Sequence, residues 1–148
     1  MSADPTASLI RSVRRIAQAI DVRSREIARL TGMTLPQLLV LQAIRSLGEV
    51  SSQALSREVF MAPPTVMAVL DRLEARGLIE RYRSAVDRRV MHSRLTPSGE
   101  QALKDAPELL GDAAIRRFAA LPDDRRRDLA EALRSVSELL DARSPDQP

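Results

Sequence analysis

The segment 61–99 constrains the fold more than any other part of the chain, because it carries start and end signals for successive elements. Pro63 and Pro64 fit the first turn of a helix but not its interior, so a helix is predicted to begin there and to end before Gly77. Residues 78–83 (LIERYR) then alternate between apolar and charged, as a half-buried strand does. The segment therefore predicts a helix followed by an extended strand.

The residues that follow complete a hairpin and start another helix. Residues 84–89 form a polar connection of hairpin length, and residues 90–95 alternate less cleanly than the first strand. Thr96 is a good N-cap, and Pro97 fits the first position of a helix. The predicted order is helix, strand, charged turn, strand, helix.

Positive charge is concentrated in the same part of the chain. Residues 72–94 contain seven arginines against three acidic residues, a local net charge of +4, although the whole chain of 148 residues carries only +3. Such an uneven distribution is expected of a protein that presents one face to a polyanion. A solvated arginine-rich surface is the alternative that charge alone leaves open.

The residues before the proline-led helix predict two further helices. One runs from Thr34 to Gly48, a glycine suited to a C-terminal cap with positive φ. Ser51 offers an N-cap for a short helix over residues 52–60, and residues 61–62 supply a tight turn into the proline-led helix, which makes a helix-turn-helix. The expected core positions are Leu38, Leu41, Ala43, Ile44 and Leu47 before the turn, and Val66, Val69, Leu70 and Leu73 after it.

Both ends of the chain predict helices that are apolar on one side only. The stripes are Leu9, Val13, Ile16, Ile20, Ile27 and Leu30 in the first helix and Leu129, Leu133, Val136 and Leu140 in the last. Between them, Pro107 and Gly111 interrupt a helix, so a kink is expected near Ala106. One-sided stripes have no partner within so small a lobe, and we expect a second chain to cover them.

The composition excludes several classes of function. Cysteine is absent, which excludes disulfides and thiolate zinc sites, and the single histidine, His92, argues against a histidine-based metal site or catalysis. Three aromatic residues are too few for the stacking surfaces of single-strand binders. We find no nucleophile–base pair, phosphate-binding glycine loop or membrane-length apolar run. We therefore expect a cytoplasmic protein that is not an enzyme and uses no cofactor or metal.

Three motifs occur in a specific order and spacing. The strongest is D-x-R followed by L-T-x-x-G, found here at 87–89 and 95–99. LPQLLVL at 35–41 and VLDRLEARGLIER at 69–81 are the other two. Together they resemble the wing, second helix and recognition helix of the multiple-antibiotic-resistance regulator (MarR) family of bacterial transcription factors. The resemblance extends over about 9–140.

This resemblance implies a mainly α fold with a small β-hairpin wing. A winged helix-turn-helix lobe is expected at 35–96, and a helical dimerisation region at 1–34 and 97–148. The family also implies an obligate homodimer whose terminal helices interleave. Such a two-fold dimer would bind double-stranded DNA at a pseudo-palindromic operator, with its recognition helices about 34 Å apart in successive major grooves.

The resemblance assigns DNA contacts by position. They are Pro64, Thr65, Met67 and Ala68 at base edges, Arg72 and Arg76 at phosphate or the groove wall, Arg88 and Arg89 at the wing tip, and Arg57 and Ser52 as weaker phosphate contacts. In the family the arginine of D-x-R, here Arg89, enters the minor groove, where a guanidinium gains from the negative potential. Asp87 cannot attract DNA by its charge, so we expect it to hold the wing arginines in place.

Two departures from the family pattern bear on specificity and on an effector. Pro64, Met67 and Ala68 stand where many members have hydroxyl or amide side chains, so specificity is expected to rest on thymine methyl groups and DNA shape. The candidate effector-pocket residues are Met33, Leu38 and Met61. Leu38 replaces an aromatic residue that is often found there, which changes one wall of the usual pocket.

The expected function is that of a dimeric, sequence-specific transcriptional regulator. We expect a repressor that a small effector, phenolic or otherwise aromatic, releases from its operator. Two alternatives stay open: a sequence-tolerant DNA-architectural protein, favoured by the apolar recognition helix, and a helical adaptor that binds only protein. Salt-dependent binding without sequence preference would mark the first alternative, and the lack of salt-dependent DNA binding the second.

Overall fold

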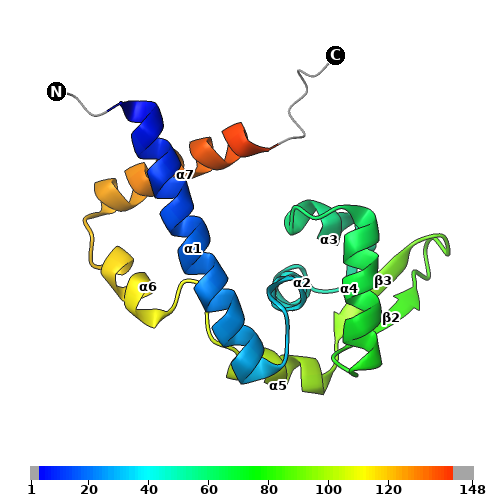
Figure 1. Ribbon diagram of the computed structural model, residues 1–148. Coiled ribbons are helices and arrows are strands. Elements are labelled where there is room, and N and C mark those ends of the chain that lie inside the picture. The colour runs from blue at the N-terminus through cyan, green and yellow to red at the C-terminus, as the bar shows by residue number, and fades with distance from the viewer. Residues whose placement is uncertain (1–3, 142–148) are drawn as a thin grey trace, which may run out of the picture. The chain divides into compact units, whose positions relative to one another are not determined.

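The computed structural model describes residues 4–141, and the chain divides into two compact units. The first unit is Met1–Leu109 and the second is Leu110–Pro148 (Figure 1). The described residues are mainly helical with one small antiparallel sheet, which confirms the predicted fold class. The predicted helical dimerisation region, 1–34 and 97–148, runs through both units, and its role stays a prediction.

The first unit is a winged helix-turn-helix lobe preceded by one long helix. Its elements are α1 (Pro5–Thr31), α2 (Leu35–Leu47), β1 (Val50–Ser51), α3 (Ser52–Glu58), α4 (Pro63–Ala75), β2 (Ile79–Arg83), β3 (Met91–Leu95) and α5 (Pro97–Asp105). The strands pair antiparallel in the order β1-β3-β2, with Val50 opposite Ser93 and Tyr82 opposite His92. The predicted hairpin and the helices on either side of it are therefore confirmed.

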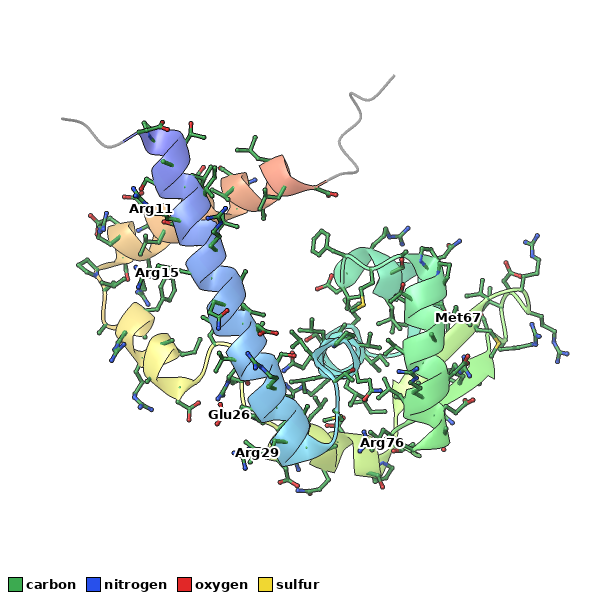
Figure 2. The ribbon with its side chains drawn as sticks, in the orientation of Figure 1. Arg11, Arg15, Glu26, Arg29, Met67 and Arg76 are labelled. Carbon is green, nitrogen blue, oxygen red and sulfur yellow. The ribbon has the colours of Figure 1, made fainter. Side chains whose placement is uncertain are left out.

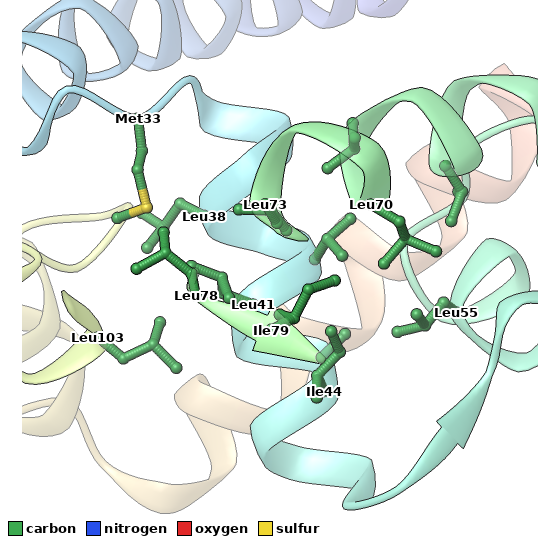
Figure 3. Packing of buried hydrophobic residues seen from close by; sticks show 14 of the residues in the cluster. Met33, Leu38, Leu41, Ile44, Leu55, Leu70, Leu73, Leu78, Ile79 and Leu103 are labelled. Carbon is green, nitrogen blue, oxygen red and sulfur yellow. The ribbon is translucent and has the colours of Figure 1, made fainter. Parts of the chain in front are cut away.

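Helix α2 is the element on which most of this unit packs, since α1, α3, α4, α5 and β3 all contact it. A capping box starts it: Gln37 N donates to Thr34 Oγ1, and Thr34 N donates to Gln37 Oε1. Figure 3 shows Leu38 of α2 and Leu73 of α4 pointing into the same apolar cluster. Because neighbours surround α2, Val40 is also fully buried although it was not a predicted core position.

One predicted core position was wrong. Leu47 is 45 % exposed, because α2 ends there and the chain turns away at Gly48, whose φ is 75°. The other predicted core residues before the turn, Leu38, Leu41, Ala43 and Ile44, are buried, as are Val66, Val69, Leu70 and Leu73 of α4. The inward stripe of α4 was therefore predicted correctly, and with it the face that α4 leaves open.

Helix α3 ends two residues earlier than predicted. The spacing predicted a helix over 52–60, but the last helical residue is Glu58, and Phe60 has a φ of 54°. Among residues 4–141, Phe60 is the only residue other than glycine with a positive φ, and it is 79 % exposed. A left-handed residue cannot continue a right-handed helix, so Phe60 makes the turn into α4.

The L-T-x-x-G motif joins α5 to the turn between α4 and β2. Thr96 Oγ1 accepts a hydrogen bond from Gly99 N (3.1 Å) and donates one to Gly77 O (2.6 Å). Thr96 N donates to Leu78 O (3.1 Å). A Cβ on Gly99 would overlap the same Leu78 carbonyl oxygen, so glycine is required for α5 to come this close.

The predicted kink near Ala106 is a complete break. The second unit contains α6 (Asp112–Ala119) and α7 (Asp123–Leu140). Helix α5 ends at Asp105, because Pro107 has no N–H to offer a continuing helix and Gly111 takes a φ of 74° just before α6. Two separate helices, α5 and α6, therefore replace the single bent helix that was expected.

The apolar stripes of the terminal helices are largely uncovered. Ile27 is the only buried residue of α1, and Ile16 is 48 % exposed. No described residue of α7 is buried, and Leu133 is 56 % exposed. Within residues 4–141 no single helix is long and apolar enough to cross a membrane; α1 and α2 reach that length and composition only when counted together across their 78° bend. Uncovered stripes of this kind supply the apolar surface that a dimer interface needs.

Replacement of Gly99 by alanine tests the contact between α5 and the α4–β2 turn. Gly99→Ala is expected to lower the free energy of unfolding by about 1–3 kcal/mol, because the new methyl group overlaps the Leu78 carbonyl. Urea denaturation at fixed protein concentration measures this. Ser98→Ala, at an exposed position of the same turn, is the control and should change stability by less than about 0.5 kcal/mol. A Gly99→Ala protein more stable than wild type would contradict the close approach.

Candidate nucleic-acid interface

Helix α4 has one open face. Its four buried residues pack toward α2 and α3, and the residues between them point away from the core. The exposed residues include five predicted DNA contacts: Pro64, Thr65, Met67, Ala68 and Arg72. Figure 2 shows Met67 pointing outward from the middle of α4, where it is 40 % exposed. Spacings of three and four residues bring these five side chains to one face of the helix.

An arginine from the wing holds the two acidic side chains of α4. Arg81 Nη2 donates to Asp71 Oδ1 (2.7 Å) and to Glu74 Oε1 (3.0 Å), and Arg81 N donates to Glu74 Oε2 (3.1 Å). The hydrogen bond from the Arg81 side chain, helped by the one from its backbone N–H, holds the pKa of Glu74 below its usual range. Since the Arg81 side chain is only 15 % exposed, this arginine connects β2 to α4 and is not available to DNA.

At the wing tip, the side chain of Arg89 is hydrogen-bonded to the carboxylate of Asp87. Asp87 Oδ1 accepts hydrogen bonds from Arg89 N and Arg89 Nε, both at 3.1 Å, and Asp87 Oδ2 accepts one from Arg89 Nη2 (3.2 Å). These bonds lower the pKa of Asp87, the side-chain bond most of all. The Arg89 side chain is nevertheless 90 % exposed. Asp87 thus lies where the predicted role of holding a wing arginine requires it.

Further hydrogen bonds shape the wing turn. Ser84 Oγ accepts from Val86 N (3.2 Å) and Asp87 N (3.3 Å), and Arg83 Nη1 donates to Arg88 O (2.8 Å). The side chain of Arg88 makes no ion pair or hydrogen bond within the described residues and is exposed. Arg88 and Arg89 therefore form a cationic tip on a turn that the rest of the hairpin braces.

Three predicted phosphate contacts lie in less favourable places. Arg76 Nη1 donates to Gly32 O (3.1 Å), across to the turn between α1 and α2. The Ser52 hydroxyl is buried and has no hydrogen-bond partner in the described structure, whereas Ser51 caps α3. Arg57 is exposed in the last turn of α3. DNA contacts by these residues stay predictions, and the geometry favours the α4 face and the wing tip over them.

A cavity of about 200 Å³ lies within the first unit, between the end of α1, the turn that follows α4, and α5. Its lining residues are Leu30, Thr31, Met33, Arg76, Leu78, Ala102 and Asp105. Of the predicted effector-pocket residues only Met33 lines it. Leu38 is fully buried in the core, and Met61 is half-buried against that core. The described residues contain no group of histidine, cysteine or acidic side chains able to hold a metal ion.

The sequence did not reveal the supporting roles of Arg81 and Arg83. Both belong to the basic cluster, but the structure assigns them to α4 and to the wing turn instead of to solvent. Alternation along LIERYR was the available signal: Arg81 shares a strand face with Ile79 and Arg83, and so faces α4. Seven arginines therefore overstate the number of cations that can reach a polyanion.

Comparison with known proteins gives a consistent result. Residues 31–90 match the family model described as "MarR family". The chain is 33 % identical over 99 residues to the uncharacterized HTH-type transcriptional regulator YsmB of Bacillus subtilis, covering 67 % of this chain and 68 % of that protein. It is 29 % identical over 149 residues to the B. subtilis transcriptional repressor MdtR, covering 99 % and 93 %. Sco3205 of Streptomyces coelicolor, a MarR family regulator solved in complex with DNA, shares the fold: its TM-score is 0.81 at 19 % identity, covering 100 % of this chain and 95 % of that one.

Titration of Asp87 tests the contact at the wing tip. Its pKa is held down by Arg89, so the carboxylate stays ionised, and the pair intact, until the pH falls through the lowered pKa. Arg89→Ala is expected to raise the pKa of Asp87 toward its usual value, as measured by carboxyl-detected NMR. Arg88→Ala removes a neighbouring charge that makes no such bond and should leave it nearly unchanged. Equal shifts in the two variants would contradict the specific pairing.

Proposed function

Because this chain belongs to the MarR family of winged helix-turn-helix transcriptional regulators, we propose that it binds a pseudo-palindromic operator as a homodimer. The family regulates transcription by binding DNA, and its members are not enzymes. The observation that carries the proposal is the pairing of an open α4 face with an exposed cationic wing tip on the same lobe. A groove helix and a wing arginine are the two parts that such a lobe needs to contact both DNA grooves.

The uncovered apolar stripes support the dimer. Leu9 and Ile16 of α1 and Leu129 and Leu133 of α7 are each at least 40 % exposed, although their spacing is that of residues that pack. A second copy of the chain would cover these stripes with identical ones, which gives a two-fold arrangement. Two lobes related in this way would present two α4 helices to a palindromic site.

Repression with release by a small effector is the regulatory part of the proposal. One relative, MdtR, is a transcriptional repressor. The cavity beside Arg76 is lined by four apolar residues together with Thr31, Arg76 and Asp105, and the Arg76 guanidinium supplies the cation that a small aromatic acid would pair with. Arg76 is the C-cap of α4 and donates to Gly32 O, so a ligand that takes this guanidinium would disturb the contact between α4 and the α1–α2 turn.

A sequence-tolerant DNA-binding protein is the second candidate, favoured by the apolar character of the exposed residues on α4. Its affinity would come mainly from counterion release, with a steep dependence on salt and little discrimination against random DNA. Binding to the upstream intergenic DNA of its own gene, in competition with a scrambled duplex of equal length, distinguishes the two candidates. Equal affinity for both duplexes would exclude the sequence-specific regulator and leave the sequence-tolerant DNA-binding protein.

Arg89→Ala tests the wing. We expect operator binding to weaken by about 1–3 kcal/mol, and the slope of log K against log salt to fall by about 1, because one guanidinium leaves the DNA. Fluorescence anisotropy at several salt concentrations measures both quantities. Arg29→Ala on α1, which removes the same charge from an exposed position outside the lobe, is the matched control and should retain wild-type affinity. A change in oligomeric state without loss of DNA affinity in Arg89→Ala would contradict the assignment.

Filling the cavity tests the effector proposal. Salicylate is expected to release operator DNA from the wild-type protein. Ala102→Leu adds three carbon atoms to a cavity of about 200 Å³ and should raise the salicylate concentration needed by roughly tenfold, about 1.4 kcal/mol, with operator affinity unchanged. Ser98→Leu, at an exposed position of the same helix that does not line the cavity, is the control. Equal salicylate sensitivity in wild type and Ala102→Leu would exclude this cavity.

A further inference from the structure

The N-terminus of α4 offers unusually few hydrogen-bond donors. A helix normally begins with free N–H groups that can bind a phosphate or a base acceptor. Here Pro63 and Pro64 have no N–H, while Thr65 N and Val66 N both donate to Ala62 O, at 3.0 and 3.1 Å. Ala62, the N-cap, adds no side-chain hydrogen bond. The first turn of α4 therefore meets DNA with apolar groups and one threonine hydroxyl.

Further along α4, most polar side chains are already engaged. Arg81 binds both Asp71 and Glu74, and Arg76 donates to Gly32 O. Among the described residues, Arg72 is left as the one charged side chain of α4 that has no ion pair or side-chain hydrogen bond. Readout of bases by bidentate hydrogen bonds requires free amide, carboxylate or guanidinium groups, and this helix has one such group on its open face.

Apolar side chains do find one distinctive group in the major groove, the C5-methyl of thymine. We propose that this protein reads its half-site chiefly through thymine methyl groups, which pack against Pro64, Met67 and Ala68; this rests on the proposed operator binding. Met67 is the longest of the three and is 40 % exposed, so it reaches furthest from the helix. Ala68 and Pro64 are short enough to let the α4 backbone approach the bases closely.

The wing, like α4, is expected to favour A·T-rich DNA. A narrow minor groove in A·T-rich DNA attracts an inserted guanidinium, and Arg89 is the exposed candidate. Thymine methyls in the major groove and a narrow minor groove beside it both select A·T pairs. The contacts inferred for α4 and those inferred for the wing therefore both favour an A·T-rich half-site.

Base analogues test the proposal on the full-length protein. The probe is the duplex that the protein protects in a footprint of its upstream intergenic DNA. Deoxyuridine in place of thymine removes only the methyl group, and 7-deazapurines remove the N7 acceptors of the same groove. Each contacted methyl is expected to be worth about fourfold in Kd, hence about sixteenfold for one thymine in each of two half-sites. The 7-deazapurine duplex should bind within about twofold of the unmodified one.

Variants of Met67 assign the contact to α4. Met67→Ala should keep its preference for the operator over a scrambled duplex but lose the deoxyuridine penalty at the thymine it covers. Met67→Leu keeps an apolar side chain of similar size and should keep the penalty. Three results would each overturn the inference. The protein could prefer its operator although deoxyuridine has no effect on affinity, it could lose more affinity with 7-deazapurines than with deoxyuridine, or Met67→Ala could keep the full deoxyuridine penalty. Equal binding of operator and scrambled DNA would instead refute sequence-specific binding itself.

Discussion

The burial of α2 is the constraint on which the rest of the lobe depends. Four helical or strand neighbours in the lobe and the end of α1 pack on this one helix, so its side chains fix where each neighbour lies. Leu70 and Leu73 are fully buried in that core. Because Leu70 and Leu73, together with Val66 and Val69, face the core, the side chains of Met67 and Ala68 face outward. The open face of α4 is therefore a consequence of core packing, and truncation of a core leucine would disturb that face.

Residues whose effects are local could be predicted from the sequence. Thr34 and Thr96 begin helices because each hydroxyl accepts a hydrogen bond from the backbone N–H three residues on, and such caps depend only on nearby residues. Prolines and glycines fixed the limits of α4 for the same reason. Where the local signal was ambiguous, prediction failed: Phe60 looks like a helical residue, but it takes the left-handed turn that the sharp approach of α3 to α4 requires.

Contacts between distant residues could not be predicted in this way. Arg76 stays a predicted phosphate contact, but the sequence did not predict that its guanidinium donates to Gly32 O, 44 residues away in the chain. Arg81 is one of seven arginines in a basic cluster, and only the packing of β2 against α4 shows that it is bound to Asp71 and Glu74. Sequence spacing gives the face of an element on which a side chain lies. The partner it meets there depends on how the elements pack, and for long flexible side chains such as arginine this partner decides the role.

The two parts of the interface draw on different sources of free energy. In the proposed complex, arginines at the wing tip would bind by displacing counterions, so their contribution would fall as salt rises and be nearly the same for any DNA sequence. The proposed contacts of apolar α4 residues would contribute by burying methyl groups, an effect that ordinary salt concentrations hardly weaken. Rising salt therefore weakens non-specific binding, which is almost wholly electrostatic, by a larger fraction of its free energy than it weakens operator binding. A protein with an apolar groove helix and a cationic wing should thus retain its specificity under ionic conditions that cost it much of its affinity.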